Sequence, residues 1–312
     1  MSDTNRQWKL SAHPRGLIAP TDLQLSESPL PVLQDGQALA RVKLLSIDPT
    51  MRIWMSDIPQ YMPPVALGEV MRAFGFAQVD ESRHPDFKKG DKVVGLTGLQ
   101  EYVVIGSGDL RSFQKVPSIP FLSDSSFLGT LGINGLTAYF GLLEIGKPQS
   151  GETLVVSSAA GATGSIVGQL GKIHGCHVVG IAGTDEKCRW IKDELGFDAA
   201  INYKQPAWKE ALKAATPKGI DINFENVGGE VMEAVISRMN VRGRVVLCGL
   251  ISGYTNQDPA LSSFGRVLMK SLTVQGFIIT NYASRFMEAG KQLGMWKVMG
   301  KLKDKQTANN DE

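Results

Sequence analysis

The fold is decided by Thr153-Leu154-Val155-Val156-Ser157-Ser158-Ala159-Ala160-Gly161-Ala162-Thr163-Gly164, which opens as an apolar run and ends in a turn of small residues. Set against the pattern G-x-G-x-x-G, Ala159 takes the first position, Gly161 the second and Gly164 the third. In that pattern the second glycine lets the backbone approach a pyrophosphate, and the third lets the helix pack close to the strand. The stretch therefore predicts a strand, a phosphate-binding turn and a helix, with a purely structural turn as the alternative.

The residues that follow alternate between short apolar runs and helical patterns, which favours the nucleotide-binding interpretation. Six strands joined by crossover helices predict an α/β fold with a parallel, doubly wound Rossmann sheet. The predicted strands are 153–157, 177–182, 199–203, 220–224, 244–248 and 272–279, and the predicted helices are 163–174, 185–195, 208–215 and 231–239.

The first part of the chain has a different composition and pattern, with many prolines and with short extended runs at 38–47, 92–96 and 102–105. Strands at this spacing, separated by Gly, Pro and Asp, predict a compact β-rich domain. With 312 residues, two domains are the expected number. We predict a β-rich domain at 1–127, a Rossmann domain at 128–290 and a C-terminal tail at 291–312.

Composition narrows the function classes. Lys and Arg number 33 and Asp and Glu number 31, so the net charge is only +2. This charge lacks the strong basic excess that is typical of proteins that bind nucleic acid. No stretch approaches the roughly 20 apolar residues that a bilayer span needs, and the polar N-terminus lacks the layout of a secretory signal. Cys176, Cys188 and Cys248 form no C-x-x-C pair, and the four histidines are scattered, which disfavours a disulfide framework and a metal site. These features predict a cytoplasmic protein without nucleic-acid or membrane partners.

The end of the second Rossmann strand bears on the cofactor. NAD-binding proteins place an acid there for the ribose 2′-OH, whereas this chain has Gly183, with Lys187 on the next helical turn. Tyr203 ends the third strand beside it. A cation and a small residue in place of the acid favour NADPH over NADH. Two alternatives stay open: Asp185 or its neighbour Glu186 folds back toward the ribose, or Lys187 is a solvated helix charge.

Five further segments carry a resemblance that spans most of the chain. They are SIDPTMR at 46–52, LGINGLTAY at 131–139, AAGATGS at 159–165, FENVGG at 224–229 and CGLISGY at 248–254. Together they resemble the medium-chain dehydrogenase/reductase superfamily, and within it the zinc-free branch of prostaglandin reductases (leukotriene B4 dehydrogenases), plant double-bond reductases and bacterial curcumin reductase. The resemblance implies an N-terminal GroES-like domain that binds substrate, a Rossmann domain that binds NADPH, and an active site in the cleft between them.

The resemblance also implies roles for individual residues. The pyrophosphate would be held by Gly161, Ala162, Thr163 and Gly164, and the 2′-phosphate by Lys187 and Tyr203 beside Gly183. Asn226 would lie by the nicotinamide ribose. The nicotinamide side would be lined by Cys248, Gly249, Ile251, Ser252, Tyr254, Phe277, Ile278 and Ile279, and the substrate would meet Thr50, Met51, Arg52 and Tyr61. Relatives commonly form dimers through the edge of this sheet, here 272–279, so a homodimer is expected.

Two departures from the family pattern concern the first domain. Thr50 stands where the family usually has Tyr after Asp-Pro, and 71–76 replaces a Gly-rich segment. The stretch that contains Met51 and Tyr61 could line a substrate pocket, because flexible Met and aromatic side chains adapt to long apolar substrates. The alternative is that these side chains pack in the core of the domain. Arg52 either binds a carboxylate or phosphate, or pairs with Asp48.

A third departure concerns the end of the chain. Family members continue past the helix that ends near Gly300 with a helix and strand, and the residues after Lys303 resemble neither. Uncovered apolar area, at about 25 cal/mol per Å², would then destabilise the first domain by several kcal/mol. We therefore keep a catalytically impaired form that only binds nucleotide as one alternative.

Without a metal ion to stabilise an alkoxide, the expected chemistry is reduction of an activated C=C bond. NADPH would deliver hydride to the β-carbon of an enone or enal, and the resulting enolate would need hydrogen-bond donors. Tyr254 is the candidate proton donor, with a role in orienting the cofactor as its alternative. The sequence thus predicts an NADPH-dependent enone or alkenal reductase acting on a small α,β-unsaturated carbonyl substrate, with a quinone reductase as the second hypothesis.

Overall fold

The computed structural model describes residues 4–106, 113–117, 119, 122–255 and 262–305, so the last part of the predicted C-terminal tail, 306–312, lies outside the described residues. The chain divides into two compact units, Met1–Leu128 and Gly129–Glu312, and each is described by itself. Within the ranges given, no helix combines the length and the apolar character that crossing a lipid bilayer requires.

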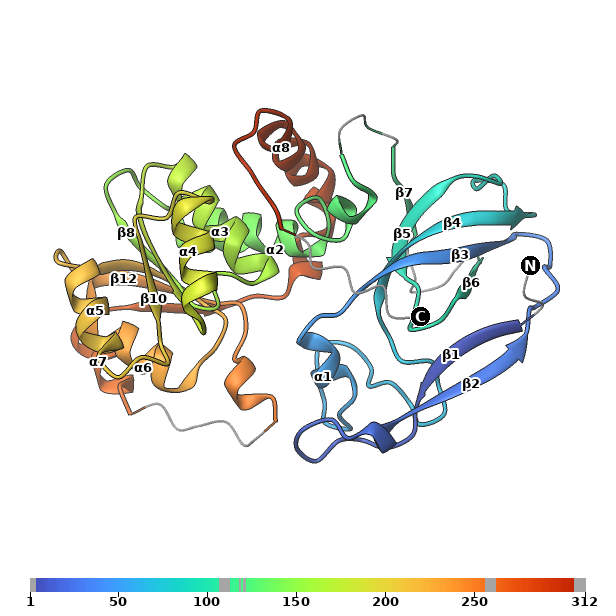
Figure 1. The fold of residues 1–312 in the computed structure, drawn as a ribbon, viewed down its shortest axis with the longest axis horizontal. Coiled ribbons are helices and arrows are strands. Elements are labelled where there is room, and N and C mark those ends of the chain that lie inside the picture. Colours follow the sequence, from blue (N-terminus) through green and yellow to red (C-terminus); the bar gives the residue numbers. More distant parts are fainter. Residues whose placement is uncertain (1–3, 107–112, 118, 120–121, 256–261, 306–312) are drawn as a thin grey trace. The chain divides into compact units, whose positions relative to one another are not determined.

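The second unit contains a six-stranded parallel sheet, as predicted (Figure 1). Its order is β10-β9-β8-β11-β12-β13, which is the 3-2-1-4-5-6 order of a dinucleotide-binding sheet, with the reversal between β8 and β11. The strands are β8 (Thr153–Val156), β9 (His177–Ala182), β10 (Ala199–Asn202), β11 (Ile220–Glu225), β12 (Met239–Leu247) and β13 (Thr273–Gly276).

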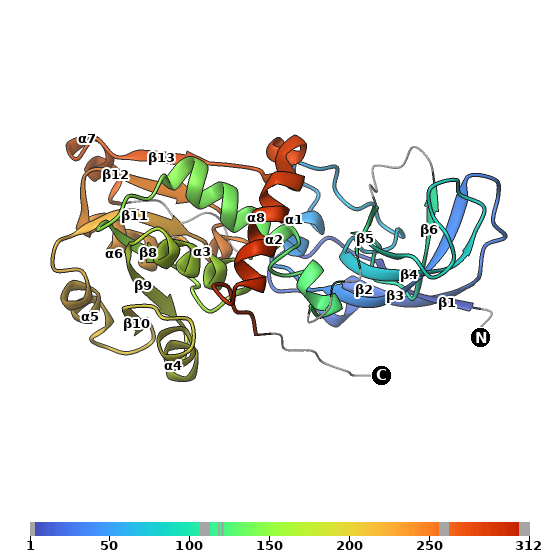
Figure 2. The same cartoon turned by 90° about the horizontal axis from the view of Figure 1, so that it is seen from above.

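Helices cover both faces of this sheet because its strands are apolar on both sides (Figure 2). Along β8, Leu154 and Val156 face one cluster of buried side chains and Val155 faces the other. The first cluster includes α2 (Ile133–Phe140), α3 (Ala162–Ile173), α4 (Asp185–Asp193) and α8 (Phe286–Val298). The second includes α5 (Trp208–Ala215) and α6 (Gly229–Arg238), with α7 (Phe264–Met269) beside them.

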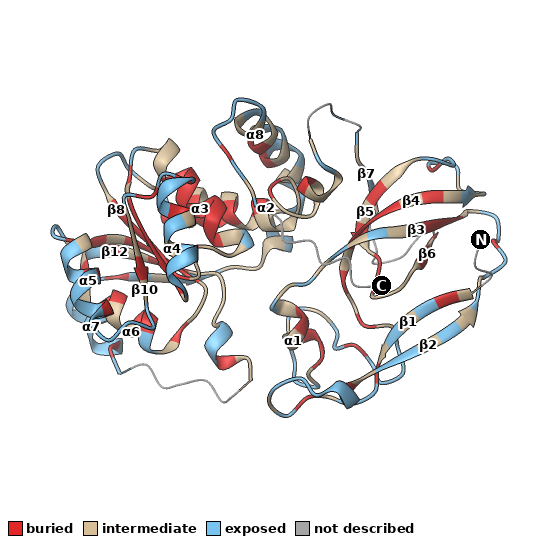
Figure 3. Cartoon of the chain, viewed as in Figure 1, coloured by how far each residue is buried: buried red, intermediate tan, exposed pale blue. Residues whose placement is uncertain are grey.

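Helix α3 is the most deeply packed helix of this layer, and residues 164–171 are all buried (Figure 3). A Cβ on Gly168 would lie 1.8 Å from Cζ of Phe197, and one on Gly171 would lie 2.5 Å from Cδ2 of Leu154. The helix lies this close to the sheet only because these positions lack side chains. The phosphate turn that precedes α3 is therefore held in a fixed place relative to the strands.

Several elements of this unit differ from the predicted ones, mostly by one or two residues at an end, and a few differ by more. β12 begins at Met239 rather than at 244, because its first residue pairs with Ile220 before a register shift. β13 ends at Gly276 rather than at 279, because its partner β12 ends at Leu247, which is paired with Gly276. A π-helical turn, Gly141–Gly146, follows α2 and was not predicted.

The first unit contains a five-stranded antiparallel sheet with the order β6-β3-β4-β5-β7 and a separate two-stranded sheet of β1 and β2. Isolated bridges link Gln7 of the two-stranded sheet to Gln100, and Lys9 to Val70, both of which lie in loops outside the five-stranded sheet. The elements are β1 (Thr4–Leu10), β2 (Leu23–Pro29), β3 (Gln37–Ser46), α1 (Thr50–Trp54), β4 (Phe74–Ser82), β5 (Lys92–Leu96), β6 (Tyr102–Gly106) and β7 (Gln114–Lys115). The β-rich character predicted for this region is confirmed.

Candidate functional site

The turn between β8 and α3 has the geometry of an anion-binding site. Gly161 caps α3 with extended backbone, and no side chain caps the helix, so its first N–H groups point out of the turn. A Cβ on Gly164 would lie 2.4 Å from the Ser158 carbonyl oxygen, which explains the need for glycine there. Ser158 itself has a φ of 50°, a conformation that few non-glycine residues adopt. The donors that remain at Ala162 and Thr163 fit a pyrophosphate.

Next to this turn, two side chains lie against Gly183, the residue after β9. A Cβ built on Gly183 would lie 3.3 Å from Cε1 of Tyr203 and 3.7 Å from Cε of Lys204. The backbone N–H of Tyr203 donates to the Ala182 carbonyl, which fixes this residue beside the strand end. Lys204 was not predicted from the sequence. A lysine in a loop carries no periodic signal, and only the pairing of β10 with β9 places it here.

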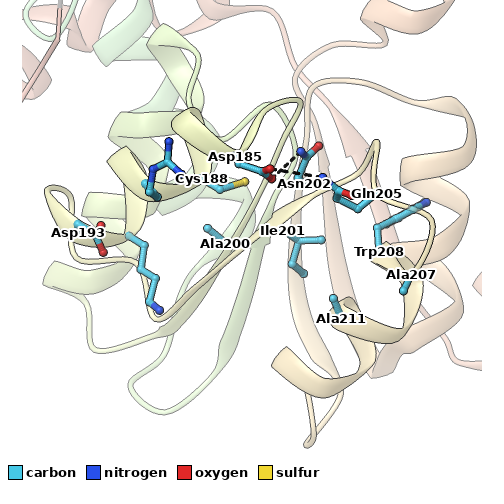
Figure 4. A pocket seen from close by; sticks show the side chains of 12 residues that line it. Asp185, Cys188, Asp193, Ala200, Ile201, Asn202, Gln205, Ala207, Trp208 and Ala211 are labelled. Atoms are coloured by element: carbon cyan, nitrogen blue, oxygen red, sulfur yellow. Dashed lines mark hydrogen bonds between the residues drawn. The ribbon is translucent and has the colours of Figure 1, made fainter.

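Asp185 was a possible acidic partner for a ribose, and the structure gives it other partners. Its carboxylate accepts hydrogen bonds from Nδ2 of Asn202 at 2.8 Å and from Nε2 of Gln205 at 3.4 Å (Figure 4). It thereby points into a groove of about 560 Å³ that α4, β10 and α5 enclose. Lys187 lies on the exposed first turn of α4, where its backbone N–H donates to Oγ1 of Thr184. The side chain of Thr184 thereby caps the N-terminus of α4.

A second pocket, of about 550 Å³, lies where β12 and β13 end. It brings together five residues predicted to line the nicotinamide side, namely Cys248, Gly249, Tyr254, Phe277 and Ile278. Three others from the same prediction are not part of its wall. Ile251 and Ser252 form a 3-10 turn, with Oγ of Ser252 near Gly228 and Gly229. Ile279 begins a 3-10 segment, Ile279–Arg285, and packs against the hydrophobic core.

Tyr254 is one of the residues that line this pocket. The phenolic oxygen accepts a hydrogen bond from the Leu250 backbone N–H at 3.4 Å. The same oxygen would lie 3.1 Å from a Cβ on Gly249, so a side chain at that position would displace it. The phenol is therefore held by the backbone of its own loop.

Cys248 is also part of the pocket wall. Burial, together with the nearby Glu225 carboxylate, raises the pKa of the Cys248 thiol to about 12. The side chain is therefore a neutral thiol, and a weak nucleophile, at physiological pH.

The end of β11 connects the pocket to the phosphate turn. Nδ2 of Asn226 donates to the Ser157 carbonyl oxygen at 2.7 Å, and the Asn226 backbone carbonyl accepts from the Ile251 N–H. Glu225, immediately before it, is fully buried and accepts four hydrogen bonds. Sequence reasoning did not single out Glu225, although a charged residue at the end of an apolar strand was a visible signal.

The candidate substrate residues of the first unit lie in different surroundings. Met51 is 8% exposed and packs with Trp54 in the core, which is the alternative interpretation of that stretch. Tyr61 is 43% exposed, and its hydroxyl accepts from Nε1 of Trp54 and bonds to Oγ1 of Thr50 at 2.6 Å. The guanidinium group of Arg52 donates to the backbone carbonyls of Pro14 and Gly16.

Potential metal ligands do not gather anywhere in the described ranges, because no three His, Cys, Asp or Glu side chains there could hold one ion.

The chain matches two family models. Residues 6–115 match a model described as the N-terminal domain of oxidoreductase, and residues 162–293 match one described as zinc-binding dehydrogenase. The chain is 43% identical to the NADPH-dependent curcumin reductase of Escherichia coli (strain K12) over 299 residues, which cover 94% of this chain and 86% of that protein. It is 38% identical to prostaglandin reductase 1 of Bos taurus over 303 residues, or 95% of this chain and 89% of that protein.

The chain is also similar to solved structures of oxidoreductases. CurA from Vibrio vulnificus in complex with NADPH aligns with a TM-score of 0.90 and 40% identity, covering 96% of this chain and 90% of that chain. A quinone oxidoreductase of Pseudomonas syringae pv. Tomato DC3000 aligns with a TM-score of 0.74 and 21% identity, over 96% of this chain and 90% of that one. The second likeness shows the fold alone.

Proposed function

The chain belongs to the zinc-free branch of the medium-chain dehydrogenase/reductase family that contains the curcumin and prostaglandin reductases, and from this premise we propose that it is an NADPH-dependent reductase of activated C=C bonds. Its substrates are small α,β-unsaturated ketones and aldehydes. The observation that carries this proposal is the arrangement of one sheet edge. The phosphate turn after β8 and the pocket after β12 lie at the carboxyl ends of the strands, on the two sides of Asn226.

The residues of this edge fit NADPH. The uncapped N-terminus of α3 suits the pyrophosphate, and Gly183 leaves space for a 2′-phosphate beside Tyr203, Lys204 and Lys187. Asp185, bonded to Asn202 and Gln205, does not take the place of the ribose-binding acid of NAD-dependent enzymes. When bound, NADPH supplies the hydride for the β-carbon of the substrate.

The protein's own contribution is to orient the reactants and to stabilise charge on the substrate oxygen. As negative charge develops there, the Tyr254 hydroxyl group donates a hydrogen bond to it, or holds the ribose of the cofactor in place. The neutral thiol of Cys248 and the side chains of Phe277 and Ile278 keep the pocket apolar. An apolar wall favours hydride transfer because it excludes water from the reacting atoms.

For the first unit we propose the substrate-binding role, with boundaries at 1–127 for this domain, 128–290 for the NADPH domain and 291–312 for the tail. Thr50, Met51, Arg52 and Tyr61 remain its candidate substrate residues. We further propose a cytoplasmic homodimer. The exposed outer strand β13 and the free thiols of Cys176, Cys188 and Cys248 support this proposal.

The direct test follows NADPH oxidation at 340 nm with a 2-alkenal, and then with a quinone, as acceptor. We expect turnover with the alkenal and a saturated aldehyde as product by mass spectrometry. Turnover with the quinone alone would make the chain a quinone reductase. Tight NADPH binding without turnover of either acceptor would leave only nucleotide binding. Tyr254→Phe is expected to lower kcat about 10-fold if the phenol donates its proton, and only about 2-fold if it orients the cofactor.

A further inference from the structure

Glu225 is a buried carboxylate that the proposed reaction does not use. It ends β11, the central strand next to β8, and its side chain is 0% exposed. A buried charge is costly unless it is fully hydrogen-bonded, so its partners show what it holds in place. Oε1 accepts from Oγ of Ser157 at 2.6 Å, from the Val227 N–H at 2.7 Å and from the Gly228 N–H at 2.9 Å. Oε2 accepts from Nδ2 of Asn223 at 3.0 Å.

These partners belong to loops that leave different strands. Ser157 is the first residue of the phosphate turn after β8, and its hydroxyl oxygen also accepts the Asn226 N–H at 2.7 Å. Val227 and Gly228 form the turn after β11. The backbone carbonyl of Glu225 accepts the N–H groups of Cys248 at 2.9 Å and Gly249 at 3.1 Å, which begin the pocket loop. The Glu225 carboxylate thus holds the phosphate turn against the β11 turn. The pocket loop is bonded to the backbone of β11 and its turn, because the Val227 carbonyl accepts the Ser252 N–H at 2.9 Å.

We propose that Glu225 is a positioning residue, which sets the distance between the diphosphate side and the nicotinamide side of the site. This inference rests on the proposed function, because it assumes a dinucleotide that spans both sides. A hydride donor must be placed within a few tenths of an ångström, so a small shift between the loops affects the reaction strongly. The carboxylate acts through Ser157 and the backbone and does not itself contact the substrate.

The same strand offers a matched control at its other end. The Asp221 carboxylate accepts the Thr153 N–H at 2.8 Å and Nδ2 of Asn240 at 2.7 Å. It therefore joins β11 to β8 as Glu225 does, but at the opposite edge of the sheet. Removing Asp221 costs fold stability and leaves the loops of the site in place.

Glu225→Gln is the conservative variant. The amide oxygen can keep the three hydrogen bonds now made to Oε1. Its NH₂ group would face Asn223, whose Oδ1 is buried and has no hydrogen-bond partner, so rotation of the Asn223 amide would satisfy both groups. Glu225→Ala removes the acceptor altogether. If Glu225→Ala does not fold, the same measurements are made on Ser157→Ala, which removes the hydrogen bond between Oγ of Ser157 and Oε1 of Glu225.

The experiment measures dissociation constants for NADPH and for 2′,5′-ADP, which lacks the nicotinamide half, by fluorescence and calorimetry. We expect Glu225→Ala or Ser157→Ala to weaken NADPH about 10-fold and 2′,5′-ADP less than about 3-fold. In the unliganded protein, the amides of Val227 and Gly228, which donate to Oε1, should exchange faster with deuterium. The primary isotope effect with 4-deuterated NADPH should rise, because hydride transfer becomes slower. Glu225→Gln should restore all three properties toward the wild type.

Asp221→Ala should lower the melting temperature and leave both dissociation constants within about 2-fold. The proposal is overturned if Glu225→Ala weakens NADPH and 2′,5′-ADP equally, or if Asp221→Ala has the same effect on NADPH. It is also overturned if the folded alanine variants transfer hydride at the wild-type rate. A wild-type protein that binds NADPH but does not reduce an alkenal would contradict the proposed function, while the binding and exchange measurements would still decide the role of Glu225.

Discussion

The two edges of the parallel sheet are built from different interactions. At the amino edge, Arg244 makes two hydrogen bonds to the Glu152 carboxylate, and Lys172 pairs with Asp198 at 2.7 Å. At the carboxyl edge, the described residues offer glycines, helix N–H groups and a buried carboxylate whose partners are loops. The amino edge is closed by paired charges, and the carboxyl edge keeps donors that can bind a ligand.

This difference separates stabilising polar groups from ligand-binding ones. Buried or paired charges occur at both edges, so burial and hydrogen bonding alone do not identify a site. In a parallel sheet every strand points the same way, and the loops that can converge on a ligand are those after the strands. Changes at the carboxyl edge should therefore affect NADPH binding, whereas changes at the amino edge should affect stability.

The largest effect is expected from Gly164→Ala at the carboxyl edge. The added Cβ would lie 2.4 Å from the Ser158 carbonyl oxygen, so α3 or the phosphate turn must move. We expect NADPH affinity to fall about 100-fold, measured by fluorescence titration. Gly265→Ala is the control, because a Cβ there meets no atom within 4 Å. Equal NADPH affinity in both variants would contradict the assignment of the turn.

The next effect concerns the cations beside Gly183. Lys204→Met and Lys187→Met should each weaken NADPH about 10-fold and NADH less than 2-fold, because only NADPH carries the 2′-phosphate. The measurement is a pair of titrations with the two nucleotides at one ionic strength. Lys218→Met is a matched control, since Lys218 is exposed and lies in the loop before β11. Equal losses for NADH and NADPH would argue against a phosphate contact.

A smaller effect, confined to stability, is expected at the amino edge. The side chains of Arg244 and Glu152 are 22% and 20% exposed, so their pairing is partly shielded from water. Arg244→Met should lower the free energy of unfolding by about 1–3 kcal/mol, and the double variant with Glu152→Gln should recover part of it. Urea unfolding gives the energies. NADPH affinity should be unchanged, and a loss of affinity would mean that the two edges are coupled.

The smallest effect is a pH dependence. Burial opposes ionisation of Asp198, but the Lys172 ammonium group and the Val178 N–H outweigh it and hold the pKa of Asp198 below its usual value. The folded pKa is thus lower than the unfolded one. The resulting stability is present above the unfolded pKa, near 4, and is lost as the pH falls through the folded pKa. Asp198→Asn should cost less than about 1 kcal/mol at pH 7, because the pair is about one-third exposed, and nothing at low pH. An equal difference between the two proteins at both pH values would show that the ion pair is not its cause.

The parallel sheet was predictable from the sequence because its strands are continuous apolar runs between helical patterns. The Trp208–Ala215 helix and the Lys92–Leu96 strand were predicted to the residue. The β1 and β2 hairpin was not, because its exposed strands carry polar residues on both faces, as in Leu23–Pro29. The early start of β12 depends on pairing across the chain, which a local pattern does not contain.

For the site, the sequence indicated residues whose type is set by backbone geometry, and Gly164 is the clearest case. The role of Lys187 was inferred from the missing acid after the second strand, and the roles of Asn226 and Tyr254 came from the family resemblance. All three stay predictions. Lys204 and Glu225 were missed for a physical reason. Their positions depend on the register of β10 with β9 and on three loops meeting at one strand end, and neither follows from neighbouring residues.

The suppressed acidity of Cys248 has a chemical consequence for an enzyme of this kind. Compounds with an activated double bond alkylate cysteine, but they react with thiolates far faster than with thiols. A sulfur atom beside the bound electrophile would be a point of self-inactivation if it ionised. Because burial raises the pKa of the Cys248 thiol to about 12, this sulfur in the pocket wall stays protonated and is protected from alkylation by an activated double bond.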